Sequence, residues 1–136
     1  MKPEGTSILL IAKPGYRRKS ISTSLHAIPT VSLHIADGKA SGMQTLHTLN
    51  PTIILIDSGS MNASDYSEFC QSIKRDHPES QCFLLVDTNK ADPEPPDQCL
   101  DGFIPTNHSA YEFVQAVKDL IKDPENTNQG QIHSTI

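Results

Sequence analysis

Short apolar runs alternate with helical spacings along the chain from Ser7 to about Lys122. The runs are typical of buried strands, and they lie at residues 8–12, 31–36, 52–57, 82–87 and 102–105. Between them, apolar residues recur at steps of three and four, which predicts helices with one buried face. Because parallel strands need long crossover connections, this alternation predicts an α/β fold with a doubly wound, five-stranded parallel sheet.

The first, third and fourth runs differ from the second in their polar content. Those three are apolar at nearly every position, whereas the second contains Ser32 and His34. A continuous apolar pattern is typical of parallel strands that helices cover on both faces. The first, third and fourth strands are therefore predicted to lie in the middle of the sheet.

The crossover after the fourth strand has an unusual composition. Between Asp87 and Gly102 it contains Pro93, Pro95 and Pro96, together with several acidic residues. Proline removes a backbone donor and disfavours helix at the residue before it. The fourth helix of the fold is therefore predicted to be short or missing.

The length and composition indicate a single domain. A chain of 136 residues with 36% apolar content is able to bury one core of ordinary size. Beyond Lys122 the sequence has almost no apolar residues and no period, which is typical of a disordered tail or linker. The predicted organisation is an N-terminal arm, one domain and a tail, at residues 1–6, 7–122 and 123–136.

Several classes of protein are disfavoured by composition. No apolar run is long enough to span a membrane and no signal peptide is recognisable, so a cytoplasmic protein is expected. A formal net charge of −5 gives no overall attraction for nucleic acid. The three cysteines and six histidines lack the spacings of disulfide frameworks and zinc sites. No glycine-rich phosphate loop follows the first strand, which argues against a nucleotide-binding enzyme.

Asp57 is the main candidate for chemistry. It directly follows the apolar run "TIILI" and precedes the small and polar residues "SGSMNAS". From the sequence alone, it is either a phosphate acceptor at the edge of the sheet or only the residue that ends a strand.

Five strand–helix units with an aspartate at the end of the third strand resemble the receiver domain of two-component response regulators, over about residues 6–122. The segment "PTIILID" resembles the family's phosphoacceptor strand, and "LDGFIPTNHSAYEFVQAVKDLI" resembles its fifth strand and last helix. Arg17 and Arg18 match an arginine pair that opens the first helix in the NarL-like branch. The resemblance implies a CheY-like fold with the flavodoxin-like strand order 2-1-3-4-5.

The family's functional positions are altered in this chain. Active receivers hold a magnesium ion with two acidic residues at the end of the first strand, where this chain has Ala12 and Lys13. The family's lysine on the fifth strand falls on Thr106, and its switch hydroxyl falls on Asp87 or, with the suitable chemistry, Thr88. The resemblance implies a degenerate phosphoacceptor site without a metal or cofactor. Its residues are Asp57, Lys13, Ala12, Thr88 and Thr106.

Lys13 offers a replacement for the metal ion. If the first and third strands are neighbours, their carboxyl ends bring Lys13 and Asp57 into the same small cavity. An ammonium group there would favour the ionised carboxylate and would hold the domain in one conformation without phosphorylation. We therefore expect an ion pair between the two residues.

Together these features predict a non-catalytic pseudo-receiver that acts through a protein partner or a homodimer in signalling or transcription regulation. In the family, the fourth helix, fifth strand and last helix form the usual contact face. The tail resembles the linker to a helix-turn-helix domain in NarL-like regulators, so a DNA-binding domain outside this chain is expected. The domain itself is expected to bind neither nucleic acid nor membrane. Two alternatives stay open: a conventional receiver phosphorylated at Asp57, and a small flavodoxin-like ligand-binding protein or enzyme with its ligand at the carboxyl ends of the strands.

Overall fold

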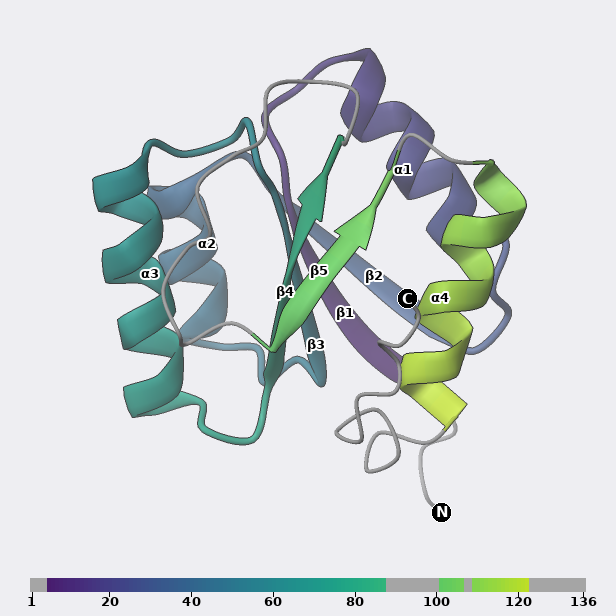
Figure 1. Ribbon diagram of the computed structural model, residues 1–136. Coiled ribbons are helices and arrows are strands. Elements are labelled where there is room, and N and C mark those ends of the chain that lie inside the picture. Colours follow the sequence, from purple (N-terminus) through teal and green to yellow (C-terminus); the bar gives the residue numbers. More distant parts are fainter. Residues whose placement is uncertain (1–4, 88–100, 107–108, 123–136) are drawn as a thin grey trace.

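The computed structural model describes residues 5–87, 101–106 and 109–122 of the chain, shown in Figure 1. Strands and helices alternate through most of this part. In chain order the elements are β1 (Thr6–Ile11), α1 (Tyr16–His26), β2 (Val31–Ala36), α2 (Lys39–Leu46), β3 (Ile53–Asp57), α3 (Ala63–Asp76), β4 (Gln81–Val86), β5 (Gly102–Pro105) and α4 (Ala110–Lys122).

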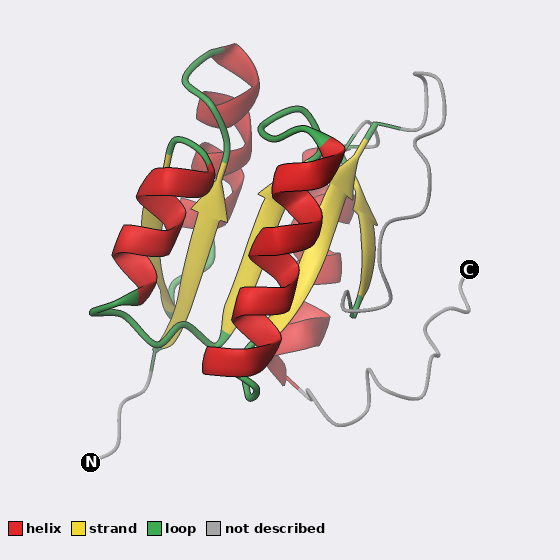
Figure 2. Ribbon diagram, turned by 90° about the vertical axis from the view of Figure 1, so that its left-hand side faces the viewer, coloured by secondary structure: helices red, strands yellow, loops and turns green. Residues whose placement is uncertain are grey.

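The five strands form one parallel sheet in the order β2-β1-β3-β4-β5. Helices α1 and α4 cover one face of the sheet, and α2 and α3 cover the other (Figure 1). Figure 2, in which α2 and α3 face the viewer, shows helices in front of and behind the sheet. This confirms the doubly wound fold, the flavodoxin-like order and the central position of the first, third and fourth strands.

The core has two layers because side chains alternate between the faces of each strand. In β1, Ile8 and Leu10 pack against α1 and α4, whereas Leu9 and Ile11 pack against α2 and α3. Strand β3 is buried at every position. The sheet is thus enclosed on both faces.

The predicted boundaries hold to within a residue or two. Strand β1 begins at Thr6, which the prediction placed in the N-terminal arm, and β4 covers 81–86 instead of 82–87. The predicted irregular crossover at 88–100 and the predicted tail at 123–136 lie outside the described residues. Within the described part of the chain, none of the helices is both long enough and apolar enough to cross a membrane.

Candidate functional site

Asp57 ends β3 at the carboxyl edge of the sheet and is almost completely buried, with 4% of its surface exposed. Two preceding side chains of the strand, Ile53 and Leu55, pack toward α1 and α4. Because side chains alternate along a strand, Asp57 points to this same face. A carboxylate at this depth loses most of its hydration, so it needs a cation or hydrogen-bond donors close by.

Arg17, in the first turn of α1, supplies that cation. Its Nε donates a hydrogen bond to Asp57 Oδ1 at 2.7 Å. This distance is typical of a charge-assisted hydrogen bond. About a third of the Arg17 side chain is exposed, whereas its Nη2 is buried and has no hydrogen-bond partner within the described residues. The ion pair therefore runs through Nε, at the border between the buried carboxylate and solvent.

Gly15 sets the direction in which α1 leaves the edge of the sheet. It immediately precedes the helix with φ 151° and ψ −177°, a conformation that is open to glycine and strained for other residues. Its carbonyl oxygen accepts the hydrogen bond of the Lys19 backbone N–H at 3.1 Å. The first helical turn thus begins close to the end of β1, and Arg17 reaches from it to Asp57.

The backbone around Asp57 is fixed by the loop that follows β3. The Ser60 side-chain hydroxyl and backbone N–H both donate to the carbonyl oxygen of Asp57, at 2.7 and 2.9 Å. The next backbone N–H, that of Ser58, donates to the carbonyl oxygen of Leu85 in β4 at 3.0 Å. These bonds hold the backbone of Asp57 in place, and its carboxylate is therefore well positioned to bind Arg17.

The prediction of an ion pair between Lys13 and Asp57 is wrong. Lys13 is exposed, and the ion-pair partner of Asp57 among the described residues is Arg17. The reason is the alternation of side chains: Ala12 packs into the layer of α1 and α4, so the next residue turns away from the face to which Asp57 points. The first helix, and not the end of the first strand, provides the cation.

The sequence contains a signal for Arg17, although the predicted site did not include this residue. Arg17 and Arg18 follow Gly15 and Tyr16, at the start of a predicted helix. An arginine in the first turn is long enough to reach the end of a neighbouring strand. Proximity along the chain to the end of β1 favoured Lys13 instead.

Of the remaining predicted site residues in the described part of the chain, Ala12 lies beside Asp57, because Ile11 and Ile56 are paired just before them in the sheet. Ala12 is buried in the core between the sheet and the helices α1 and α4. Thr106 donates a side-chain hydrogen bond to the carbonyl oxygen of Val86 at 3.2 Å, so it is turned to the end of β4. Thr88 lies outside the described residues, next to the half-buried Asp87.

The residues around Asp57 do not fit the magnesium ion that active receivers hold. Ala12 offers no ligand atom, Lys13 brings a positive charge, and Asp57 already uses one oxygen for Arg17. Among the described residues, no three or more His, Cys, Asp or Glu side chains lie together in a way that could hold a metal ion. The guanidinium of Arg17 is the cation of this site.

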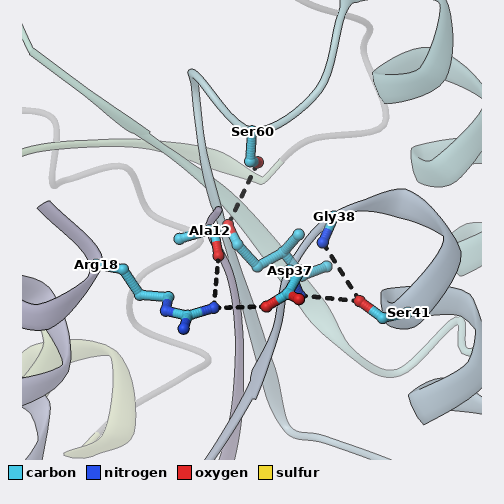
Figure 3. A network of polar contacts seen from close by, with 7 residues as sticks. Ala12, Arg18, Asp37, Gly38, Ser41 and Ser60 are labelled. Atoms are coloured by element: carbon cyan, nitrogen blue, oxygen red, sulfur yellow. Dashed lines mark hydrogen bonds and ion pairs between the residues drawn. The ribbon is translucent and has the colours of Figure 1, made fainter. Parts of the chain in front are cut away.

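Arg18, the next residue of α1, makes a second ion pair at the same edge of the sheet (Figure 3). Its Nη1 donates to Asp37 Oδ1 at 2.6 Å and to the carbonyl oxygen of Ala12 at 3.2 Å. The backbone N–H groups of Asp37 and Gly38 both donate to the Ser41 hydroxyl, at 2.9 and 3.3 Å. Arg18 thereby links the turn after β1 to the turn after β2.

Two hollows in the described surface lie outside the Asp57 site. One, of about 460 Å³, lies by the turns that precede β3 and β4, with Pro51, His77 and Glu79 in its lining. The other, of about 660 Å³, lies beside the start of α2, with Gly38, Lys39 and Asp65 in its lining. There, hydrogen bonding to Glu68 raises the pKa of Lys39 above its ordinary value. Asp57 lines neither hollow.

The sequence matches no protein-family model, and no curated protein matches it. Solved structures do match, and they are receiver domains. The N-terminal domain of a response regulator/sensory box/GGDEF three-domain protein from Carboxydothermus hydrogenoformans gives a TM-score of 0.73 at 15% identity, over 89% of this chain and 98% of the other. The signal receiver domain of NarL from Mycobacterium tuberculosis gives 0.67 at 18% identity, over 88% of this chain and 98% of the other.

The isolated receiver domain of RcsB from Salmonella enterica serovar Typhimurium, studied in the presence of the phosphomimetic beryllofluoride, is a further match. It gives a TM-score of 0.68 at 15% identity, over 87% of this chain and 89% of the other. At these identities the likeness establishes the fold. The chain therefore has the receiver fold that the resemblance implied.

Proposed function

We propose that this chain is a receiver-type signalling domain, without enzymatic activity, that keeps one conformation without phosphorylation. The observation that carries the proposal is the ion pair between Arg17 Nε and the buried Asp57 carboxylate, 2.7 Å apart. In this proposal Arg17 takes the place of the metal ion of active receivers. The domain is thus a pseudo-receiver, and the arginine pair at the start of α1 supports its likeness to the NarL-like branch.

The chemistry of phosphoryl transfer supports this proposal. An aspartate that accepts a phosphoryl group needs a free carboxylate oxygen and a cation that bridges it to the incoming, negatively charged group. Here one oxygen is hydrogen-bonded to a cation that belongs to the chain itself. In this conformation the charge of Asp57 is therefore balanced by the chain itself, and no signal is needed to bring the balancing cation.

The proposed output is contact with a protein partner or a second copy of the chain. Two aromatic side chains are exposed near the face that the resemblance indicates, with 52% exposure for Phe103 in β5 and 70% for Tyr111 in α4. Among the similar structures, a response regulator is seen in complex with a histidine kinase, and RcsB dimers are seen bound to DNA. By analogy, we place this domain in cytoplasmic signalling that regulates transcription, with a DNA-binding domain outside this chain.

The test is a titration of the chain with magnesium and beryllofluoride, in which the amide chemical shifts are recorded by NMR at each step. The isolated RcsB receiver domain serves as the reference. We expect the amides of Asp57 and its neighbours to stay unchanged at millimolar magnesium, with or without beryllofluoride. A saturable shift at these amides at sub-millimolar magnesium would overturn the proposal.

A conventional receiver phosphorylated at Asp57 is the second candidate. It is favoured by the position of Asp57 at the end of β3 and by the partial exposure of Arg17, since an exposed cation is able to move aside. Incubation with acetyl phosphate, followed by mass spectrometry of the intact chain, separates the two. The added mass of one phosphoryl group, lost in an Asp57→Asn variant, supports this candidate.

A ligand-binding protein or enzyme with a flavodoxin-like fold has less support. Such a protein holds its ligand at the carboxyl ends of the strands. The two hollows described above do not include Asp57, and the carboxylate there is already paired. The arrangement fits a domain that presents a surface better than one that encloses a ligand.

A further inference from the structure

The first turn of α1 makes side-chain contacts with residues on both sides of β1. Arg17 bonds to Asp57 at the end of β3, and Arg18 bonds to Asp37 just after β2. In the sheet, β1 lies between β2 and β3. The two arginines therefore attach the amino end of one helix to two strands that are not neighbours of each other.

The geometry of a helix makes these two contacts depend on each other. Successive side chains of an α-helix are about 100° apart around its axis, so a rotation that brings one arginine closer to its partner moves the other. Arg18 also donates to the carbonyl oxygen of Ala12, which closes the turn between β1 and α1. Its contacts thus fix both the rotation and the position of the helix start.

Asp37 provides a fixed anchor for Arg18. The turn that carries it is held by the two hydrogen bonds to Ser41 seen in Figure 3. The Asp37 side chain is nevertheless 68% exposed, so water and salt screen its charge and its pair with Arg18 adds little to stability. The pair between Asp37 and Arg18 therefore acts mainly by holding the Arg18 side chain in place.

We propose that Arg18 and Asp37 are positioning residues, which hold α1 at the rotation that lets Arg17 reach Asp57. The inference rests on the proposed function, because it concerns how the ion pair between Arg17 and Asp57 is maintained. Loss of the pair between Arg18 and Asp37 leaves the fold in place and loosens the pair between Arg17 and Asp57. In this proposal, a contact in the turn after β2 affects the ion pair at the end of β3.

The test measures hydrogen exchange of the Arg17 Nε–H by nitrogen-15 NMR of the full chain. In the Asp37→Asn variant we expect this exchange to become about five- to tenfold faster, the size of effect seen between coupled neighbours. Asp37→Glu keeps the carboxylate and is expected to restore protection. Glu68→Gln is the matched control, since it removes an exposed partner of Lys39 between α2 and α3 and is expected to leave the Arg17 signal unchanged.

The amide protons of β1 and β3, measured in the same samples, show whether the whole fold has loosened. Faster exchange of the Arg17 Nε–H with unchanged strand amides supports the positioning role. An equal increase at the strand amides, or no change at Arg17 in Asp37→Asn, overturns it while leaving the proposed function intact. An Arg17 Nε–H that exchanges freely in the unmodified chain contradicts the ion pair itself, and with it the proposed function.

Discussion

Asp57 and Asp37 take part in two ion pairs of similar length but different surroundings. Each accepts a hydrogen bond from an arginine of the first turn of α1, at 2.7 Å for Asp57 and 2.6 Å for Asp37. The Asp57 side chain is 5% exposed and the Asp37 side chain is 68% exposed. A buried charge that loses its partner is costly, whereas an exposed one is solvated by water. We therefore expect burial, and not bond length, to decide how much each pair contributes to stability.

Arg17→Met is expected to have the largest effect on stability. It leaves the Asp57 carboxylate buried without a cation, and we expect the free energy of unfolding in urea to fall by about 2–3 kcal/mol, below the range for fully buried pairs because Arg17 is partly exposed. Arg18→Met is the matched control and is expected to cost about 1 kcal/mol or less. A larger loss for Arg18→Met than for Arg17→Met would reverse the comparison.

Gly15→Ala tests whether both pairs depend on the same helix start. The backbone conformation of Gly15 is strained for alanine, and we expect a loss of about 1–3 kcal/mol in the free energy of unfolding. Both arginine side chains should also show faster Nε–H exchange in this variant. Gly59→Ala, at another exposed glycine of this edge with no positive φ, serves as the control. Equal stability of the two variants would show that the conformation of Gly15 is unimportant.

A double-mutant cycle sharpens the assignment of the partner of Asp57. For Arg17→Met combined with Asp57→Asn, we expect a coupling energy of about 1–2 kcal/mol, because the two groups are in direct contact. For Lys13→Met combined with Asp57→Asn, we expect additivity within about 0.5 kcal/mol, because Lys13 is exposed and turned away. The opposite ranking of the two cycles would restore Lys13 as the partner.

Asp37→Asn is expected to have the smallest effect on stability. The pair is exposed, so the free energy of unfolding should change by about 0.5 kcal/mol or less, and less still in high salt. Chemical denaturation at low and high ionic strength checks this. A loss comparable to that of Arg17→Met would show that the exposed pair holds the fold together, and would remove the distinction between the two aspartates.

Most of the fold was predictable because it follows from burial. Strands enclosed on both faces have few polar positions, and this pattern placed the first, third and fourth strands in the middle of the sheet. Asp57 was also recognisable as a candidate, because it directly follows a continuous apolar run and precedes small and polar residues. Its partner was harder to predict. Arg17 and Lys13 are both close to the end of β1 in sequence, and only the alternation of side chains and the rotation of α1 decide which of them reaches Asp57.

The contact between Arg18 and Asp37 depended on information that the pattern does not contain. The two residues are 19 positions apart, and the distance between them is set by the turn after β2. That turn is held by Ser41, a small polar residue whose role is visible only once the loops are in place. Sequence patterns describe which face of an element is buried, whereas such contacts depend on how the loops at the edge are arranged.

Whether Arg17 replaces the metal ion is tested most directly by comparing magnesium binding by the unmodified chain and by a variant with the acidic pair restored. The variant carries Ala12→Asp, Lys13→Asp and Arg17→Gln, so it restores the acidic residues at the family's two positions, removes the positive charge of Lys13 and loses the internal cation. Amide shifts around Asp57 are followed during a magnesium titration of both proteins, with a variant carrying only Arg17→Gln as control. We expect a saturable shift in the triple variant and no shift in the unmodified chain. Saturable binding by the unmodified chain would contradict the claim that Arg17 replaces the metal ion.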